Sequence, residues 1–171
     1  MANNNLVLII DADIARSSST TEHPVSSSGR KVLESIITSK HSICFCPKLL
    51  AEWKKHRSGY STKWLASMFA KRKVEFTDSS HAIEALLSEI EEDSKHKEIA
   101  LKDVHLIDSS LVNSKIIFSN DDNARRAFVH FSERIGAIQV VVWLNSVTEN
   151  NIIDETIKKG CIPENAIFLK V

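Results

Sequence analysis

The sequence has 171 residues, of which 43% are hydrophobic and 26% are charged. This composition is typical of a globular protein and excludes collagen-like, coiled-coil and wholly disordered chains. The 22 basic residues balance the 22 acidic ones, so the chain as a whole is not expected to be attracted to nucleic acid or to an anionic membrane. No apolar run approaches the ~20 residues of a membrane-spanning helix.

Cysteine usage indicates the compartment. The three cysteines are Cys44, Cys46 and Cys161, and an odd, small number in a chain of this length does not form a disulfide framework. Residues 1–5 are polar and lack the basic start of a secretory signal. We therefore expect a cytoplasmic protein, with Cys44 and Cys46 as thiols in its core.

Hydrophobic patterning predicts strands that alternate with helices along the chain. Residues 6–10 form an unbroken apolar run, typical of a strand buried on both faces of a parallel sheet. In chain order we expect a polar loop at 17–29, a helix at 30–39, a strand at 43–46, a helix opened by Pro47, a helix around 64–69, an edge strand at 74–76, a helix from Ser79 and Ser80 to Ile90, a helix at 102–112, a strand at 116–118, a helix at 124–135 closed by Gly136, a strand at 139–144, a helix ending before Gly160, and a short strand at 167–170. This order predicts a single domain over residues 1–171, a three-layer α/β/α sandwich with a mainly parallel central sheet.

Acidic residues follow two of the predicted strands. Asp11 and Asp13 follow the first strand, and Asp121 and Asp122 follow the strand at 116–118. Ligands of open α/β sheets bind beyond the carboxyl ends of the strands. Converging carboxylates repel one another unless a hard divalent cation neutralises them, and oxygen ligands select Mg²⁺ or Mn²⁺. Such an ion supports hydrolysis of a phosphodiester.

Four acid-bearing segments resemble those of PIN-domain nucleases in order and in approximate spacing. They are residues 9–14, 50–53, 102–111 and 117–121. The resemblance implies a PIN-like fold and metal-dependent nuclease activity, most often on RNA. The four acidic positions of the family, which are both catalytic and metal-binding, correspond to Asp11, Glu52, Asp103 and Asp121. Toxins of toxin–antitoxin pairs belong to this family, so single-stranded RNA, an antitoxin protein and a second copy of the chain are the expected partners.

Three further acids lie close in sequence to these four positions. Asp13 stands where the family commonly has Asn or Asp, and is a candidate additional metal ligand. Asp108 is another candidate, although it lies about 140° around the helix from Asp103. Asp122 is expected to cap the helix that follows it.

A basic segment surrounds Glu52. Between Lys48 and Lys73 the only acid is Glu52, whereas the next stretch, to Asp93, is acidic. Such a segment is either a solvated helix face or a surface that binds phosphates. The candidate nucleic-acid-binding residues on it and beside the other acids are Arg16, Lys54, Lys55, Arg57, Lys63, Arg125 and Arg126.

Two other functions stay open. Asp11-Ala12-Asp13 also resembles the first motif of haloacid-dehalogenase-type phosphatases, in which Asp11 would be the nucleophile, Asp13 the general acid and Lys102 the lysine. Against this, the second strand ends in Cys46-Pro47 instead of Ser or Thr, and Glu52 and Asp103 would have no role. The other alternative is a PIN-like module that binds RNA or protein without cutting.

Three residues near these motifs have ordinary structural interpretations. His105 is expected on the helix surface more readily than as a general base. Trp53 and Trp64 could stack on bases, but their apolar neighbours favour packing in the core.

Overall fold

The computed structural model describes residues 4–78 and 80–171. Within these residues the strands form one sheet in the order β3-β2-β1-β4-β5. Every neighbouring pair is parallel. The strands are β1 (Val7–Ile10), β2 (Ser42–Phe45), β3 (Val74–Phe76), β4 (Ile116–Phe118) and β5 (Val142–Leu144). The predicted parallel sheet is therefore confirmed.

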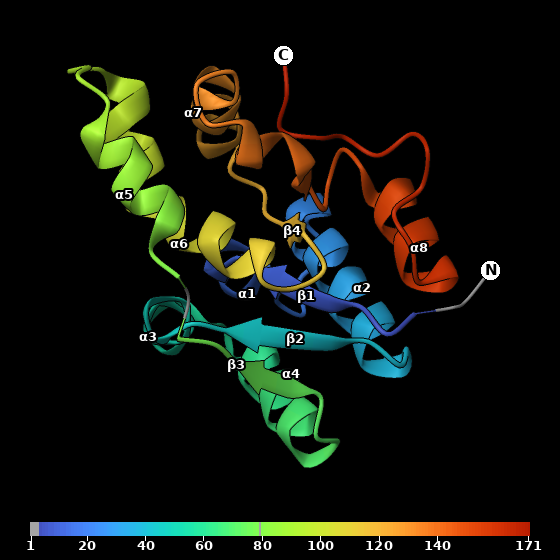
Figure 1. The fold of residues 1–171 in the computed structure, drawn as a ribbon. Helices are drawn as coiled ribbons and strands as arrows, with labels where there is room; N and C mark the ends of the chain where they lie inside the picture. The colour runs from blue at the N-terminus through green and yellow to red at the C-terminus, as the bar shows by residue number, and fades with distance from the viewer. Residues whose placement is uncertain (1–3, 79) are drawn as a thin grey trace.

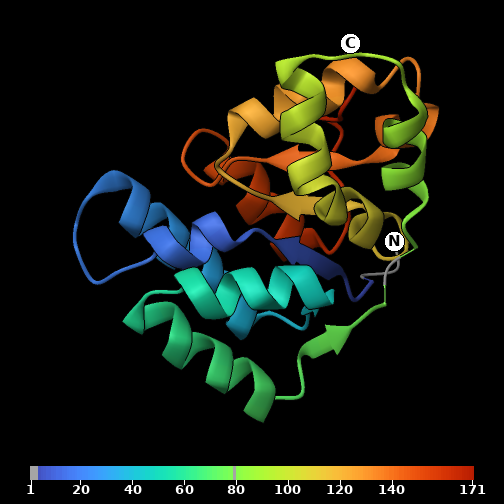
Figure 2. The same ribbon diagram turned by 90° about the vertical axis from the view of Figure 1, so that its left-hand side faces the viewer.

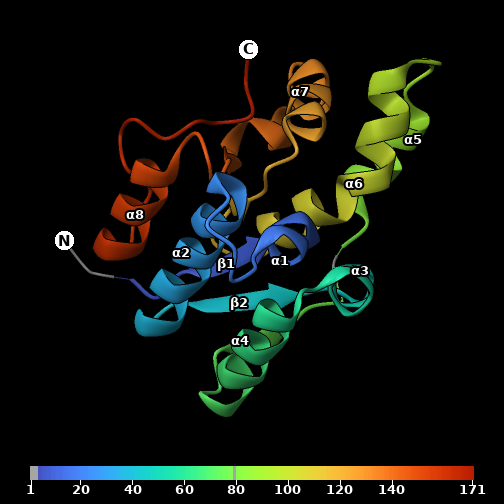
Figure 3. The same cartoon turned by 180° about the vertical axis from the view of Figure 1, so that it is seen from behind.

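Helices cover both faces of the sheet. They are α1 (Ala12–Ser17), α2 (Pro24–Thr38), α3 (Pro47–His56), α4 (Gly59–Ala70), α5 (Ala82–Glu89), α6 (Lys95–Leu111), α7 (Asp122–Phe131), the 3₁₀ helix η1 (Gly136–Val140) and α8 (Asn150–Lys159). α6 crosses the face seen in Figure 1 and contacts β1 and β4. α2 lies on the opposite face, where it contacts α4 and α8 (Figure 3). The three-layer α/β/α architecture is confirmed.

The core explains why these segments form strands and helices. Leu8, Ile9 and Ile10 of β1 are all buried, as expected for a central strand with helices on both faces. Trp53 is fully buried, and its indole N–H donates to the carbonyl of Ile10 at 2.8 Å. This bond holds α3 against the end of β1, beside α1 (Figure 2).

Other core predictions are also confirmed. Trp64 is buried, with its indole N–H donating to the carbonyl of Leu33 at 2.6 Å. Cys44 and Cys46 are buried thiols. α8 ends at Gly160, whose φ of 64° is the left-handed conformation that glycine adopts most readily.

The beginning of α2 corrects one prediction. The polar segment 17–29 is not a loop throughout, because α2 begins at Pro24. Pro24 occupies the first helical position, where its missing N–H is not needed. The ring of His23 accepts a hydrogen bond from the backbone N–H of Val25 and caps the helix.

The C-terminal third also differs from the prediction. α7 ends at Phe131, and Gly136 begins η1 instead of closing α7. The segment that follows becomes a strand only at Val142, and Phe168 forms a single antiparallel bridge instead of a strand. None of the helices within the described residues is long and apolar enough to cross a membrane.

The helix ending near Ile90 has an unexpected cap. The first residue of α5 is Ala82, and Ser80 does not cap it, while Ser79 lies outside the described residues. Instead the Asp108 carboxylate accepts the N–H groups of Ile83 and Glu84, at 2.9 and 3.3 Å. α5 is thereby attached to α6, against which it packs (Figure 1).

Candidate functional site

The predicted acids meet in a cleft at the carboxyl ends of β1 and β4. From β1 the chain builds β2 and β3 on one side, then returns to build β4 and β5 on the other. A sheet in this order has a crevice at its switch point, which is where ligands of such sheets bind. The cleft has a volume of about 160 Å³. Its lining includes Asp11, Asp13, Arg16, Glu52, His56, Lys102, Asp103 and Asp121.

Asp11 and Asp13 are held by the segment that follows β4. The Ser119 hydroxyl donates to Asp11 Oδ2 at 2.7 Å, and the Asn120 backbone N–H donates to Asp13 Oδ2 at 2.9 Å. Asp13 Oδ1 is buried and has no hydrogen-bond partner among the described residues. A buried carboxylate oxygen without a donor is unfavourable, so this atom is a candidate to contact a cation or a water molecule.

Asp121 serves the fold with one oxygen. It is the N-cap of α7, and its Oδ1 accepts the N–H groups of Asn123 and Ala124 at 3.0 and 2.9 Å. No residue in the described part of the chain donates to its Oδ2. The cap was expected at Asp122, which instead begins α7 and lies 3.7 Å from the guanidinium of Arg125.

Glu52 reaches the cleft from α3 and is bound by a histidine from α6. His105 Nε2 and Glu52 Oε2 are 3.0 Å apart. His105 is only 7% exposed, so its predicted position on the helix surface is wrong. Burial acts to raise the pKa of Glu52, but the hydrogen bond from His105 and the charges of His105 and Lys48 outweigh it and the pKa is lowered. Glu52 is therefore a carboxylate at neutral pH.

Asp103, Asp11 and Asp13 have raised pKa values. For Asp103, burial is the largest cause, and the charges of Asp11 and Asp121 add to it against Lys102, so that its pKa rises to about 6. Burial also raises the pKa of Asp11 and, with the charge of Asp11, that of Asp13. Without a counter-charge, the cleft thus disfavours the ionised form of three of its acids.

The donor set fits a hard divalent cation in its chemistry, because the acids offer only carboxylate oxygens. The described side chains, however, are not arranged as a metal site in this structure. Among the described residues, no group of three or more His, Cys, Asp or Glu side chains is gathered closely enough to hold a metal ion. Ser119 holds Asp11, His105 holds Glu52 and α7 holds one oxygen of Asp121. Binding of Mg²⁺ or Mn²⁺ would require some of these side chains to turn, and it stays a prediction.

Asp108 does not belong to this cleft. It is 1% exposed, and its two oxygens accept the backbone N–H groups of α5 described above. The five-residue step from Asp103 turns it away around α6. Its candidate role as a metal ligand is therefore corrected to a helix cap.

The basic candidates lie at different distances from the cleft. Arg16 lines the cleft itself, and Arg126 lines an adjoining groove of about 430 Å³ that shares Asp13, Arg16 and Asp121 with it. Further out, the remaining candidates of the basic segment are Lys54 and Lys55 on α3, Arg57 at its end and Lys63 on α4. The side chains of Lys54, Lys55 and Lys63 are exposed.

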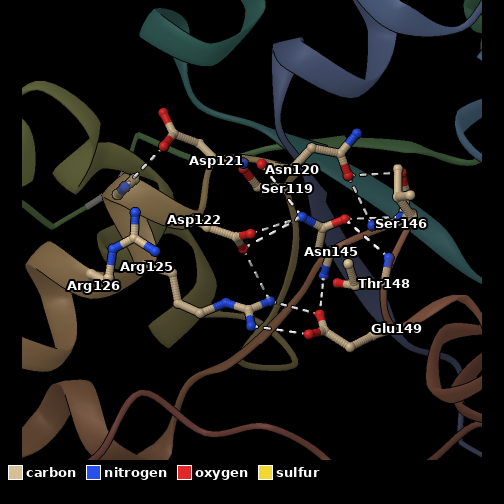
Figure 4. A network of polar contacts seen from close by, with 12 residues as sticks. Ser119, Asn120, Asp121, Asp122, Arg125, Arg126, Asn145, Ser146, Thr148 and Glu149 are labelled. Atoms are coloured by element: carbon tan, nitrogen blue, oxygen red, sulfur yellow. Dashed lines mark hydrogen bonds and ion pairs between the residues drawn. The ribbon is translucent and has the colours of Figure 1, made fainter. Parts of the chain in front are cut away.

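Arg125 is not available for a phosphate. Its guanidinium forms a paired hydrogen bond with both oxygens of Glu149, at 3.0 and 2.6 Å (Figure 4). Both side chains are largely buried, with 16% and 12% exposed. The structure therefore places Arg125 in the scaffold behind the cleft.

Sequence reasoning missed several residues that line the cleft or hold its acids. Ser119 follows β4 directly, and the rule that brought the acids to this edge applies to it equally. His56 is four residues after Glu52, which places both on one face of α3. His105 gave no comparable signal, because its partner comes from a distant helix.

A scan against family models and a search of curated proteins find no match for this sequence. The resemblance to PIN-domain nucleases therefore depends on the four acid-bearing segments.

Proposed function

We propose that the protein is a metal-dependent nuclease that hydrolyses RNA. The observation that carries the proposal is the convergence of Asp11, Asp13, Glu52, Asp103 and Asp121, from distant parts of the sequence, on one cleft at the switch point of the sheet. Repelling carboxylates with raised pKa values are typical of sites that receive a cation or perform chemistry.

Asp11, Glu52, Asp103 and Asp121 would hold Mg²⁺ or Mn²⁺, with the unpaired Oδ1 of Asp13 beside them. When bound, the cation supplies neutralisation of the phosphodiester charge and an activated water. Ser119 orients Asp11 through its hydroxyl, and the Asn120 N–H orients Asp13.

The basic side chains in and around the cleft would bind the phosphate backbone of the substrate. An acidic cleft repels a polyanion, so association requires positive charge along the approach. Arg16 and Lys102 lie in the cleft and Arg126 lies in the adjoining groove. Contacts of this kind position a strand without reading its sequence.

The proposed place of action is the cytoplasm. Free cysteines, two of them buried, are consistent with a reducing cytoplasm. Single-stranded RNA is the proposed substrate. A small antitoxin protein that covers the cleft, and a homodimer, are the proposed protein partners.

The test is cleavage of end-labelled single-stranded RNA with Mg²⁺, with Mn²⁺ and with EDTA, and with single-stranded DNA in a parallel arm. We expect cleavage only with metal. Asp11→Asn should lower the rate at least about 100-fold, since even outer-shell partners of a metal site are typically worth 10- to 100-fold. Asp154→Asn, on α8 outside the cleft, is the matched control and should retain full activity. Full activity in EDTA or in Asp11→Asn would contradict the proposal.

One observation keeps the phosphatase alternative in the test. Lys102 lines the same cleft as Asp11 and Asp13, the three residues that such an enzyme would use. A phosphatase would turn over a small phosphomonoester, form a covalent phosphate on Asp11 and tolerate Glu52→Gln. RNA binding without cleavage under any metal condition would favour the non-catalytic module.

A further inference from the structure

A buried histidine lies between the acidic cleft and a second cavity. The side chain of His105 is 8% exposed, and its Nε2 faces Glu52, which lines the cleft. His105 also lines a separate cavity of about 230 Å³ beside Cys46 and His81. Its Nδ1 is buried and has no partner among the described residues. The hydrogen bond to Glu52 is therefore the one polar contact that the described structure gives to this ring.

The direction of that bond is determined by chemistry. A glutamate side chain has an ordinary pKa well below neutral, so Glu52 is a carboxylate, and a carboxylate only accepts hydrogen bonds. His105 Nε2 therefore carries the hydrogen and donates it to Glu52 Oε2 across 3.0 Å. No residue within the described ranges donates to the other oxygen, Oε1. One oxygen of Glu52 is thus held by the protein, while the other is unpaired in a residue that lines the cleft.

The bond also joins two helices that each supply a candidate ligand. Glu52 belongs to α3, and Asp103 lies on α6 two residues before His105. A second link between these helices runs from the Lys48 ammonium to the carbonyl of Lys102. Glu52 has three rotatable side-chain bonds, and without a partner it would populate several rotamers in the cleft.

We propose that His105 is a positioning residue, which holds the Glu52 carboxylate so that its other oxygen is presented to the cation of the acidic cleft. This inference rests on the proposed function, because it requires Glu52 to be a ligand. Outer-shell donors orient ligands in this way, and their loss typically weakens metal affinity by about 10- to 100-fold.

The experiment measures Mn²⁺ binding to the full chain without nucleic acid, from the electron paramagnetic resonance signal of free Mn²⁺. His105→Phe keeps a ring in the space but removes the donor. His105→Gln places an amide N–H near the position of Nε2, whereas in His105→Asn the amide is too short to reach Glu52. His130→Phe is the matched control, because His130 forms an equivalent bond to Glu92, at 2.9 Å, outside the cleft.

We expect His105→Phe and His105→Asn to weaken Mn²⁺ binding about 10- to 100-fold, and His105→Gln and His130→Phe to remain close to the parent. At saturating Mn²⁺ the kcat of His105→Phe should recover, which a general loss of structure would not allow. If His105→Phe does not fold, the comparison of His105→Gln with His105→Asn tests the same inference.

Two results would overturn the inference and leave the nuclease proposal intact. One is unchanged Mn²⁺ affinity in His105→Phe while Asp11→Asn abolishes binding. The other is equal weakening in His105→Gln and His105→Asn. If neither the parent nor Asp11→Asn binds Mn²⁺, the proposed function fails and the positioning role fails with it.

Discussion

Acidic residues lie on both sides of the carboxyl end of β4, but they are ion-paired on one side and line a shared cleft on the other. Toward β5, Arg125, Asn145 and Glu149 form a network in which both oxygens of Glu149 accept from the Arg125 guanidinium and one also accepts the backbone N–H of Asn145 (Figure 4). Burial acts to raise the pKa of Glu149, but its hydrogen bonds from Arg125 and Asn145 outweigh burial and the pKa is lowered. Toward β1, burial raises the pKa of Asp103 to about 6, and Asp13 keeps an unpaired oxygen.

This difference separates structure from function at one edge of the sheet. Buried charge that is paired and hydrogen-bonded supports the fold, whereas buried charge of one sign is retained at the expense of stability. The network toward β5 should therefore govern stability, and the cleft toward β1 should govern activity. Each of the following variants tests one side of that division.

The largest effect on stability is expected when the ion pair between Arg125 and Glu149 is broken. Arg125→Met keeps much of the side-chain volume but leaves the Glu149 carboxylate buried without its partner. Removing one member of a buried ion pair costs about 3 kcal/mol or more in the free energy of unfolding. Urea denaturation measures this loss. Nuclease activity per folded molecule should be unchanged, and a specific loss of RNA binding would return Arg125 to the substrate surface.

Asp103 and Asp108 allow a matched comparison on one helix. Asp103→Ala removes repulsion from the cleft and should stabilise the apo protein in EDTA by about 1 kcal/mol, a value kept low because the side chain is partly exposed. Asp108→Ala gains the same helix propensity but leaves two N–H groups of α5 without an acceptor, and should lose about 1–3 kcal/mol.

Mn²⁺ should sharpen this contrast. It should raise the melting temperature of the parent and of Asp108→Ala, but that of Asp103→Ala much less, because binding to the folded state stabilises it by linkage. If Asp103→Ala melts well below the parent in EDTA, Asp103 supports the fold and the cleft is not under repulsion at this residue.

The raised pKa of Asp103 makes the stability of the folded protein depend on pH. The pKa of Asp103 is about 6 in the folded protein, against 3.8 as its ordinary value, so the folded state binds more protons between these values. The penalty of its ionised form is complete above about pH 6 and is relieved as the pH falls toward 4. The stability advantage of Asp103→Ala over the parent should therefore be greatest at pH 7 and should shrink on acidification.

Thermal melts in EDTA at pH 7, 6 and 5 measure that difference. Burial lowers the pKa of His41, whose protonation destabilises the fold in the same pH range. His41 is present in both proteins, so its contribution cancels in the comparison. An advantage that does not change with pH would show that Asp103 keeps an ordinary pKa.

The sequence predicted those features that depend on local pattern or on a general rule of sheets. Residues 6–10 are apolar on both faces, which identifies a central strand, and acids after parallel strands must meet at one edge. Some errors are local, such as the start of α2 and the cap of α7, but those that matter most for the site concern partners that are remote in the chain. Asp108 caps a helix 25 residues before it, Arg125 binds Glu149 24 residues after it, and His105 is buried against Glu52 from another helix. Residue type does not reveal these partners, since each depends on how the layers pack.

The smallest predicted effect concerns the exposed cations, and it tests whether the functional side extends beyond the cleft. Lys54, Lys55 and Arg57 have no side-chain partner within the described part of the chain, so their charges are free to meet phosphates. Replacing all three by Ala should weaken binding to unrelated single-stranded RNAs about equally. Because each phosphate contact contributes about 0.7 to the slope of log affinity against log salt, the slope should fall in magnitude by about 2.

The control replaces Lys158 and Lys159 by Ala on α8, where both lysines are already paired with Asp154 and Glu155, at 2.6 and 2.5 Å. These charges are neutralised within the protein, and their loss should leave the salt slope unchanged. Filter binding of a labelled RNA in EDTA, over a range of salt concentrations, gives both slopes without cleavage. Equal slopes for the triple variant and the parent would show that the basic segment is a solvated helix face. RNA recognition would then depend on cationic side chains that the triple variant retains, above all Arg16 and Lys102 in the cleft and Arg126 in the groove that adjoins it.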